Sequence, residues 1–278
     1  MIPSELRKKA REVLNGNWGK VACMAFIYLF ISLLLMAFVD HFEEDTLLFG
    51  LLYVASILVL LPLSYGFAIS FLKLKRKENV ELFDYVKKVF SNFTATWDVF
   101  IQIVAKMIIP IIVGFFIALC FFLIVFVAEV PMSWPLALLW VAISLACLVY
   151  FVARGLLYVL SYYILADNEN LEGKDCVEKS EELMMGNRGN YFLLQLSFIG
   201  WFVVMAVILA LILVVTIAMV LDFMHIAVAL LLSFLLDGAL ILLYVWLTPY
   251  MLTATACFYD DIRTSKAKVI DGKNKIEK

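Results

Sequence analysis

Met184 to Trp201 read MMGNRGNYFLLQLSFIGW, and Leu14 to Phe26 near the start of the chain read LNGNWGKVACMAF. Both stretches place Gly-Asn-x-Gly directly before a long apolar run. Glycine, and less often asparagine, ends helices by adopting the left-handed backbone conformation. We therefore interpret Gly16-Asn17 and Gly186-Asn187 as turns that end a short helix and direct the chain into an apolar one.

The composition indicates which solvent surrounds most of the chain. Of its 278 residues, 65% are hydrophobic and 17% are charged, whereas a soluble domain has roughly 45–50% apolar and about 25% charged residues. A soluble fold of this size could not bury so much apolar surface, so we expect most of the chain to lie in lipid. The five cysteines are scattered, without a C-x-x-C pair, and predict neither a disulfide framework nor a zinc site.

Six apolar runs are long enough to cross a bilayer, which takes about 20 apolar residues in a helix. They cover residues of about 20–40, 47–72, 98–129, 133–165, 191–221 and 226–258. The first run is longer than the apolar region of a cleavable signal, so we expect a retained span. The sequence predicts a single polytopic membrane domain over residues 1–265 and a basic, disordered cytoplasmic tail over 266–278.

Lysine and arginine gather in alternate connections between these runs. They occur in the N-terminal tail, in the loops after the second and fourth runs, and in the C-terminal tail. The other three loops, around DHFEED, EVPMSW and LDFMH, contain no lysine or arginine. Because these residues accumulate on the cytoplasmic side of a membrane, we predict that both termini are cytoplasmic.

A short amphipathic stretch precedes each odd-numbered run. The stretches are PSELRKKAREVL (3–14), NVELFDYVKKVF (79–90) and GKDCVEKSEELMM (173–185). Apolar residues recur in them at helical spacing, and helices so short and charged suit the membrane interface. The sequence thus predicts an all-α membrane protein with six transmembrane helices in three hairpin repeats, each preceded by a cytoplasmic interfacial helix. Chance similarity among apolar sequences is the alternative to the repeat.

Polar residues within the apolar runs are the candidate site, because a charge there costs about 2.5–3.5 kcal/mol or more. Asp98, Gln102 and Lys106 recur every four residues and form one stripe on the third run. Arg154 lies in the fourth run and Asp237 in the sixth. Three interpretations stay open: a hydrated cavity for an anionic substrate, a lipid head group or a proton; a structural ion pair; or snorkelling of Lys106 and Arg154 to the interface.

Further structural roles are expected in the last two runs. Trp201 follows Gly200, and we expect this glycine to let a neighbouring helix approach closely. Pro249 is expected to kink the sixth run, and Tyr250 to lie near a span end in an aromatic belt. The acidic pair of FYDD (258–261) is interpreted as a solvated helix end.

Several segments together resemble one known family. They are REVLNGNWGK, YYILADNENLEGKDCVEKSEELMMGN, LSFIGW and WLTPYMLTATACFYDDI, and they resemble the domain-of-unknown-function 975 family of bacterial integral membrane proteins over nearly the whole chain. The resemblance implies a multi-spanning protein of the bacterial plasma membrane and implies no established activity. A looser similarity to the membrane domain fused to some glycerophosphodiester phosphodiesterases implies an association with lipid.

The sequence contains no catalytic motif, and its segments outside the runs are short. We therefore expect no enzyme activity, no cofactor and no metal. The favoured function is transport or handling of a lipid or small anionic molecule, in a cavity lined by Lys106, Arg154 and Asp237. The alternative is a non-catalytic accessory or scaffold protein of the cell envelope. The expected partners are membrane lipids, with anionic head groups at the cytoplasmic face, and not nucleic acid.

Overall fold

The computed structural model describes every residue except 1, 43–45, 124–133, 169, 222–224 and 277–278, and for 88–90, 122, 136 and 267–276 it describes only the backbone. The described residues form helices and turns, with no strand among them. Six of the helices are long and apolar enough to cross a membrane. The all-helical, multi-pass architecture agrees with the hydropathy of the sequence.

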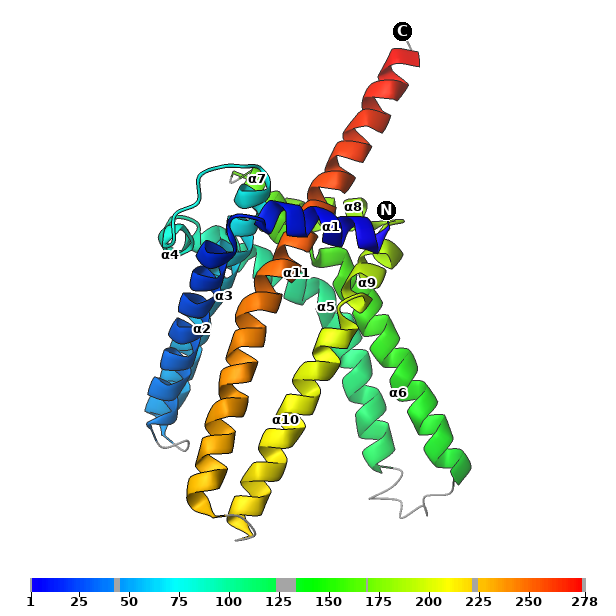
Figure 1. The fold of residues 1–278 in the computed structure, drawn as a ribbon. Helices are drawn as coiled ribbons and strands as arrows, with labels where there is room; N and C mark the ends of the chain where they lie inside the picture. Colours follow the sequence, from blue (N-terminus) through cyan, green and yellow to red (C-terminus); the bar gives the residue numbers. More distant parts are fainter. Residues whose placement is uncertain (1, 43–45, 124–133, 169, 222–224, 277–278) are drawn as a thin grey trace. The chain divides into compact units, whose positions relative to one another are not determined.

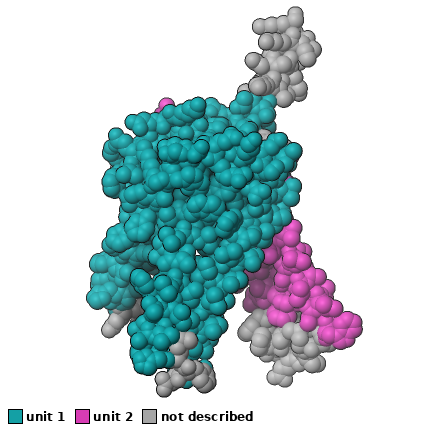
Figure 2. Space-filling model, in the orientation of Figure 1, with its two compact units in different colours: residues 1–93, 190–278 teal, residues 94–189 magenta. Residues whose placement is uncertain are grey.

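Contacts divide the chain into two compact units (Figure 2). Unit 1 comprises Met1–Phe93 and Asn190–Lys278, and unit 2 comprises Thr94–Gly189. The single domain expected over residues 1–265 stays a prediction.

Unit 1 is built around the N- and C-terminal parts of the chain (Figure 1). Its helices are α1 (Pro3–Leu14), α2 (Trp18–Asp40), α3 (Leu47–Lys75), α4 (Asp84–Ser91), most of α9 (Arg188–Leu196), α10 (Ile199–Val220) and α11 (Ile226–Ile276). α1 contacts α11, and α1 buries Leu6, Ala10 and Leu14, which recur every four residues and form one face. The core of unit 1 therefore lies where α1 meets α11, whose residues 253–259 are all buried.

At most 17% of the most apolar part of each spanning helix is buried within the structure, because the apolar surface of a span is solvated by lipid rather than by protein. The close packing occurs near the span ends. On α3, a Cβ at Gly66 would lie 2.5 Å from the carbonyl oxygen of Tyr85 on α4. Only glycine leaves room for α4 at this point, and Tyr85 is fully buried there. Burial raises the pKa of Tyr85 to about 12.

Unit 2 contains α5 (Phe93–Phe122), α6 (Trp134–Gly155), the 3₁₀ turn η2 (Leu156–Tyr158), α7 (Ser161–Asp167) and α8 (Gly173–Met184). The short helix α8 turns one side inward and buries Cys176, Val177, Ser180 and Met184. It packs against η2 and α7. The buried part of unit 2 thus lies between α8 and the segment that follows α6.

Gly16 and Gly186 both have a left-handed backbone conformation, with φ of +82° and +84°. Each stands two residues beyond the last residue of a short helix, α1 or α8. The amide of the following asparagine donates to a carbonyl of the helix, from Asn17 to Leu14 over 2.9 Å and from Asn187 to Met184 over 3.0 Å. The two Gly-Asn-x-Gly stretches therefore make the same turn.

Three of the predicted runs, the fourth, the fifth and the sixth, differ from the helices observed. The fourth changes from α-helical to 3₁₀ hydrogen bonding at η2, and the fifth divides between α9 and α10 at residues 197–198. A side chain from a short helix donates to a carbonyl at each break: Ser180 Oγ to Leu157 over 2.7 Å, and Arg7 to Ser197 over 3.2 Å. Hydropathy did not predict these breaks, because each predicted apolar run continues across its break.

The sixth run is the first part of a longer helix. α11 continues through Pro249 and extends to Ile276. It therefore includes most of the tail that the sequence predicts to be disordered. The kink expected at Pro249 stays a prediction.

Candidate functional site

Two of the candidate residues, Lys106 and Arg154, share one carboxylate in unit 2. Lys106 Nζ lies 3.9 Å from Glu181 Oε2, and an Arg154 guanidinium nitrogen lies 3.9 Å from Glu181 Oε1. Lys106 comes from α5, Arg154 from the last turn of α6 and Glu181 from α8. We call these three residues the charge cluster.

Two contacts that precede Glu181 along α8 fix this helix against the rest of unit 2. At its start, the amide of Gly173 donates to Asp98 Oδ2 over 2.6 Å. A Cβ at Gly173 would lie 2.6 Å from the backbone of Asp98, so only glycine allows this approach. Near its end, Ser180 Oγ donates to the Leu157 carbonyl. Glu181 follows Ser180 directly and is therefore held between α5 and α6.

The charge cluster has more donors than its carboxylate accepts. A charged N–H···O hydrogen bond spans about 2.7–2.9 Å, so two contacts of 3.9 Å are ion pairs without hydrogen bonds. Arg154 Nε is buried and has no hydrogen-bond partner among the described residues. The side chains of Lys106 and Arg154 remain 39% and 33% exposed, against 21% for Glu181. The cluster thus places two partly exposed cations around a single carboxylate, and the buried Nε of Arg154 has no partner among the described residues.

The other predicted residues lie at different places. Asp98 accepts the Gly173 hydrogen bond, and Gln102 is half-buried on α5 between Asp98 and Lys106. Asp237 belongs to unit 1 and is exposed on α11. Its predicted meeting with Lys106 and Arg154 stays a prediction.

Sequence reasoning missed Glu181 as the carboxylate that the two cations approach. It lies in a short charged helix that was assigned to the interface as a whole. Glu178 and Glu182 on the same helix are exposed. The signal that could have distinguished Glu181 is its spacing, four residues after the buried Val177 and three before the buried Met184. Its position beside the buried Ser180 becomes informative only once the inward side of α8 is known.

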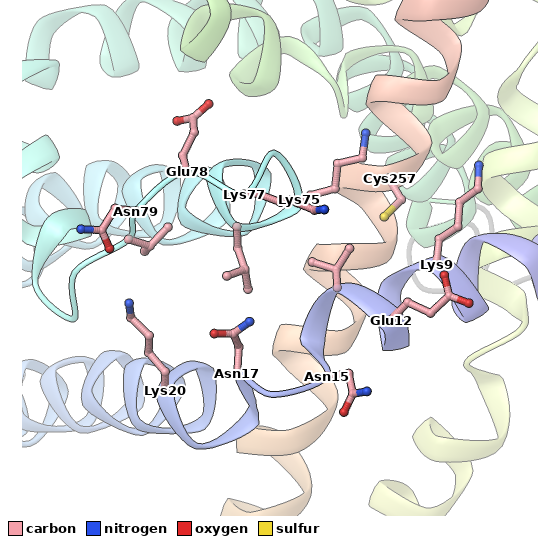
Figure 3. Close-up of a pocket in the computed structure, with 13 residues that line it drawn as sticks. Lys9, Glu12, Asn15, Asn17, Lys20, Lys75, Lys77, Glu78, Asn79 and Cys257 are labelled. Atoms are coloured by element: carbon pink, nitrogen blue, oxygen red, sulfur yellow. The ribbon is translucent and has the colours of Figure 1, made fainter.

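A polar cavity of about 820 Å³ lies in unit 1 (Figure 3). It is lined by α1, by the turn into α2, by the end of α3 with the segment that follows it, and by α11. Its charged and amide-bearing lining residues are Lys9, Glu12, Asn15, Asn17, Lys20, Lys75, Lys77, Glu78 and Asn79. Figure 3 shows Lys20 and Asn17 on one side of it and the segment with Glu78 and Asn79 on the other, with the Glu78 carboxylate directed away from Lys20. We call this space the polar cavity.

The acidic pair of FYDD joins α11 to the two helices beside it. Asp260 pairs with Lys75 and Arg76 of the α3 end over 2.5 and 2.7 Å, and Asp261 pairs with Lys9 of α1 over 2.6 Å. The hydrogen bond from Lys9 to Asp261 raises the pKa of Lys9. The interpretation of this pair as a solvated helix end is therefore wrong, because both carboxylates have cationic partners from other helices.

Tyr250 lies in the core of unit 1 rather than at its surface. It is 6% exposed, its hydroxyl donates to the Arg7 carbonyl over 3.4 Å, and its ring packs against Phe198 and Trp246. Trp246 also packs against Trp201, with ring centroids 4.7 Å apart. A Cβ at Gly200 would meet no described atom within 4 Å, so the close approach expected there is not observed.

Among the described residues, no group of three or more histidine, cysteine or acidic side chains is placed to hold a metal ion. No curated protein and no solved structure matches the chain. A family model does match, over residues 1–266, and its description reads "Protein of unknown function (DUF975)". Since this match covers almost the whole length, the chain belongs to the DUF975 family.

Proposed function

We propose that the protein is a non-enzymatic, multi-pass protein of the bacterial plasma membrane that handles a lipid or a small anionic molecule. Lys106 and Arg154 bind the anionic group of this ligand, and Glu181 balances their charge when the ligand is absent. The excess of cationic donors over one carboxylate carries the proposal. The protein's partners are then membrane lipids with anionic head groups.

The surroundings of the charge cluster favour a lipid as the source of the anion. Arg154 lies at the end of α6, and Val149 and Phe151 on the turns before it are 60% and 43% exposed. Lipid tails cover such a surface in a bilayer, and the phosphate of the same lipid then lies near the helix end. An arginine guanidinium provides paired donors that match phosphate oxygens.

The orientation and the repeat belong to the same proposal. Both termini lie in the cytoplasm, because the connections rich in lysine and arginine alternate with connections that lack both. Three hairpins, each following a short interfacial helix, account for the shared turn at Gly16 and Gly186. The short helices α1 and α8 each bury one side against the spans of their own unit.

The proposal is tested by measuring how phosphatidylglycerol binds to the full chain in mild detergent, using native mass spectrometry. Arg154→Gln should weaken binding at least about tenfold, since a hydrogen bond to a charged group contributes about 1.5–3 kcal/mol. Glu181→Gln should strengthen binding, because it leaves two cations without their carboxylate. Glu178→Gln on the exposed side of α8 is the matched control and should change nothing.

Each competing interpretation predicts a different result. A purely structural ion pair predicts that Glu181→Gln lowers the unfolding midpoint without strengthening binding. Snorkelling predicts that Lys106→Gln and Arg154→Gln leave binding and stability unchanged. The alternative function, an accessory or scaffold protein of the cell envelope, predicts no dependence of phosphatidylglycerol binding on any residue of the cluster.

A further inference from the structure

Lys77 has a backbone conformation that costs free energy for any residue with a Cβ. Its φ is +60°, and no other non-glycine residue in the described part of the chain has a positive φ. The amides of Lys77 and Glu78 donate to the carbonyls of Leu74 and Lys73, each over 3.0 Å. This is the Schellman arrangement of a helix end, in which the left-handed position is usually glycine.

The chain places glycine at this position after α1 and α8, as Gly16 and Gly186, but lysine after α3. A strained residue persists where something other than backbone conformation favours its side chain, and such residues gather at binding sites. Lys77 lines the polar cavity. The side chain of Lys77 is therefore a candidate for ligand contact there.

The polar cavity has unpaired charges of both signs. Two of its lysines, Lys9 and Lys75, are paired with aspartates of α11. Among the described residues, no ion pair involves the remaining four charged lining residues, Lys20, Lys77, Glu12 and Glu78. Lys20 and Glu78 come from opposite sides of the cavity (Figure 3). A ligand with one anionic and one cationic group would complement Lys20, Lys77 and Glu12.

The position of these charges indicates where such a ligand comes from. Lys20 lies in the first turn of α2, and Lys77 lies two residues after the last residue of α3. Both lysines therefore lie at the end of a span. Lipid head groups occupy this level of a bilayer. We propose that the polar cavity binds a lipid head group with a phosphate and an ammonium, as in phosphatidylethanolamine. Lys20 and Lys77 contact the phosphate, and Glu12 contacts the ammonium.

This site uses no residue of the charge cluster and lies in the other unit, so it goes beyond the proposed function. The test compares phosphatidylethanolamine, phosphatidylglycerol and soluble phosphoethanolamine as ligands of the full chain in detergent, by native mass spectrometry. The variants are Lys77→Gly and Glu12→Gln. Their matched controls are Lys8→Gln and Glu5→Gln, exposed positions of α1 outside the cavity lining.

Lys77→Gly should raise the unfolding midpoint without lipid, because glycine adopts this φ without strain. The same variant should weaken phosphatidylethanolamine binding at least about tenfold, as expected for loss of a charged contact. Glu12→Gln should also weaken phosphatidylethanolamine binding but should not weaken phosphatidylglycerol binding. The two controls should leave phosphatidylethanolamine binding unchanged.

Three results would each overturn the proposal. If Lys77→Gly left phosphatidylethanolamine binding unchanged, the lysine would not contact the ligand. Tighter binding of both lipids to Glu12→Gln would indicate a purely anionic ligand. If soluble phosphoethanolamine bound as tightly as the lipid, the ligand would not come from the bilayer.

Discussion

Replacing Asp260 by asparagine tests how the end of unit 1 is held together. The Asp260 carboxylate accepts hydrogen bonds from Lys75 over 2.5 Å and from Arg76 over 2.7 Å. Asparagine preserves the volume and removes the charge, so that two neighbouring cations at the end of α3 lose their counter-ion. The adjacent Asp261 pairs only with Lys9 in the described structure, which makes Asp261→Asn the matched control.

The expected cost follows from how exposed the partners are. The side chain of Asp260 is 12% exposed, and those of Lys75 and Arg76 are 24% and 26% exposed. Breaking a fully buried pair costs about 3–5 kcal/mol, and an exposed pair contributes about 0–1 kcal/mol. The Asp260 site lies between these limits, so we expect a loss of about 2 kcal/mol. Because Lys9 is 51% exposed, the control should lose about 0.5 kcal/mol.

The measurement is thermal unfolding in detergent, followed with a maleimide that fluoresces when it reacts with a thiol. Cys257 is fully buried in unit 1 and becomes reactive on unfolding, so a variant that keeps only this cysteine reports on the region around Asp260. At about 2–4 °C per kcal/mol for a chain of this size, Asp260→Asn should lower the midpoint by about 4–8 °C and Asp261→Asn by about 1–2 °C. Equal shifts for the two variants would refute the argument from burial.

Three further predictions concern helix ends and α8. Gly173→Ala should push α8 away from Asp98 and cost about 1–3 kcal/mol, seen as faster maleimide labelling of Cys176. Gly16→Ala should cost about 1 kcal/mol because φ is +82°, whereas Gly19→Ala meets open space and should not lower the thermal midpoint. Burial raises the pKa of Cys176 from 9.0 to about 11. The stability gained by keeping its thiol protonated is therefore present below pH 9 and is lost as the pH rises through about 11. Cys176→Ala should reduce the pH dependence of the midpoint in that range, measured by circular dichroism.

The spanning helices could be predicted from the sequence because one physical quantity decides them. A bilayer requires about 20 consecutive apolar residues, and each of the six runs that satisfy this condition overlaps one of the six helices that are long and apolar enough to span. The internal breaks could not be predicted. Ser197 and Leu157 lie inside the predicted apolar runs, and their carbonyls accept hydrogen bonds from residues distant in the sequence.

Helix ends were predictable where glycine marks them. Gly16 and Gly186 have the positive φ that only glycine adopts without strain. The equivalent position after α3 is Lys77, and a lysine in a basic segment gives no sign of an unusual backbone. The sequence could therefore predict the backbone conformation at the ends of α1 and α8. It could not predict it at the end of α3, where we propose that the side chain of Lys77 contacts a ligand.

Part of the charge cluster was predictable for a similar reason. A lysine and an arginine within apolar runs are costly and therefore conspicuous, which indicated Lys106 and Arg154. Glu181 lies among other acidic residues of a charged helix, where a carboxylate does not have the free-energy cost of a charge within an apolar run. Pairing between distant segments depends on which side of α8 faces inward, and Gly173 and Ser180 decide that through contacts with α5 and η2.

Hydrogen bonds from the short helices explain why these helices stay beside the spans. Near hydrocarbon, a carbonyl freed by a helix break must find a donor within the protein, since no water is at hand. Arg7 of α1 provides that donor at Ser197, and Ser180 of α8 bonds the carbonyl of Leu157. Each short helix is thus joined to an irregular point of a span in its own unit. The same contact at Ser180 positions the next residue, Glu181, between Lys106 and Arg154, so the break in the fourth run and the charge cluster depend on one helix.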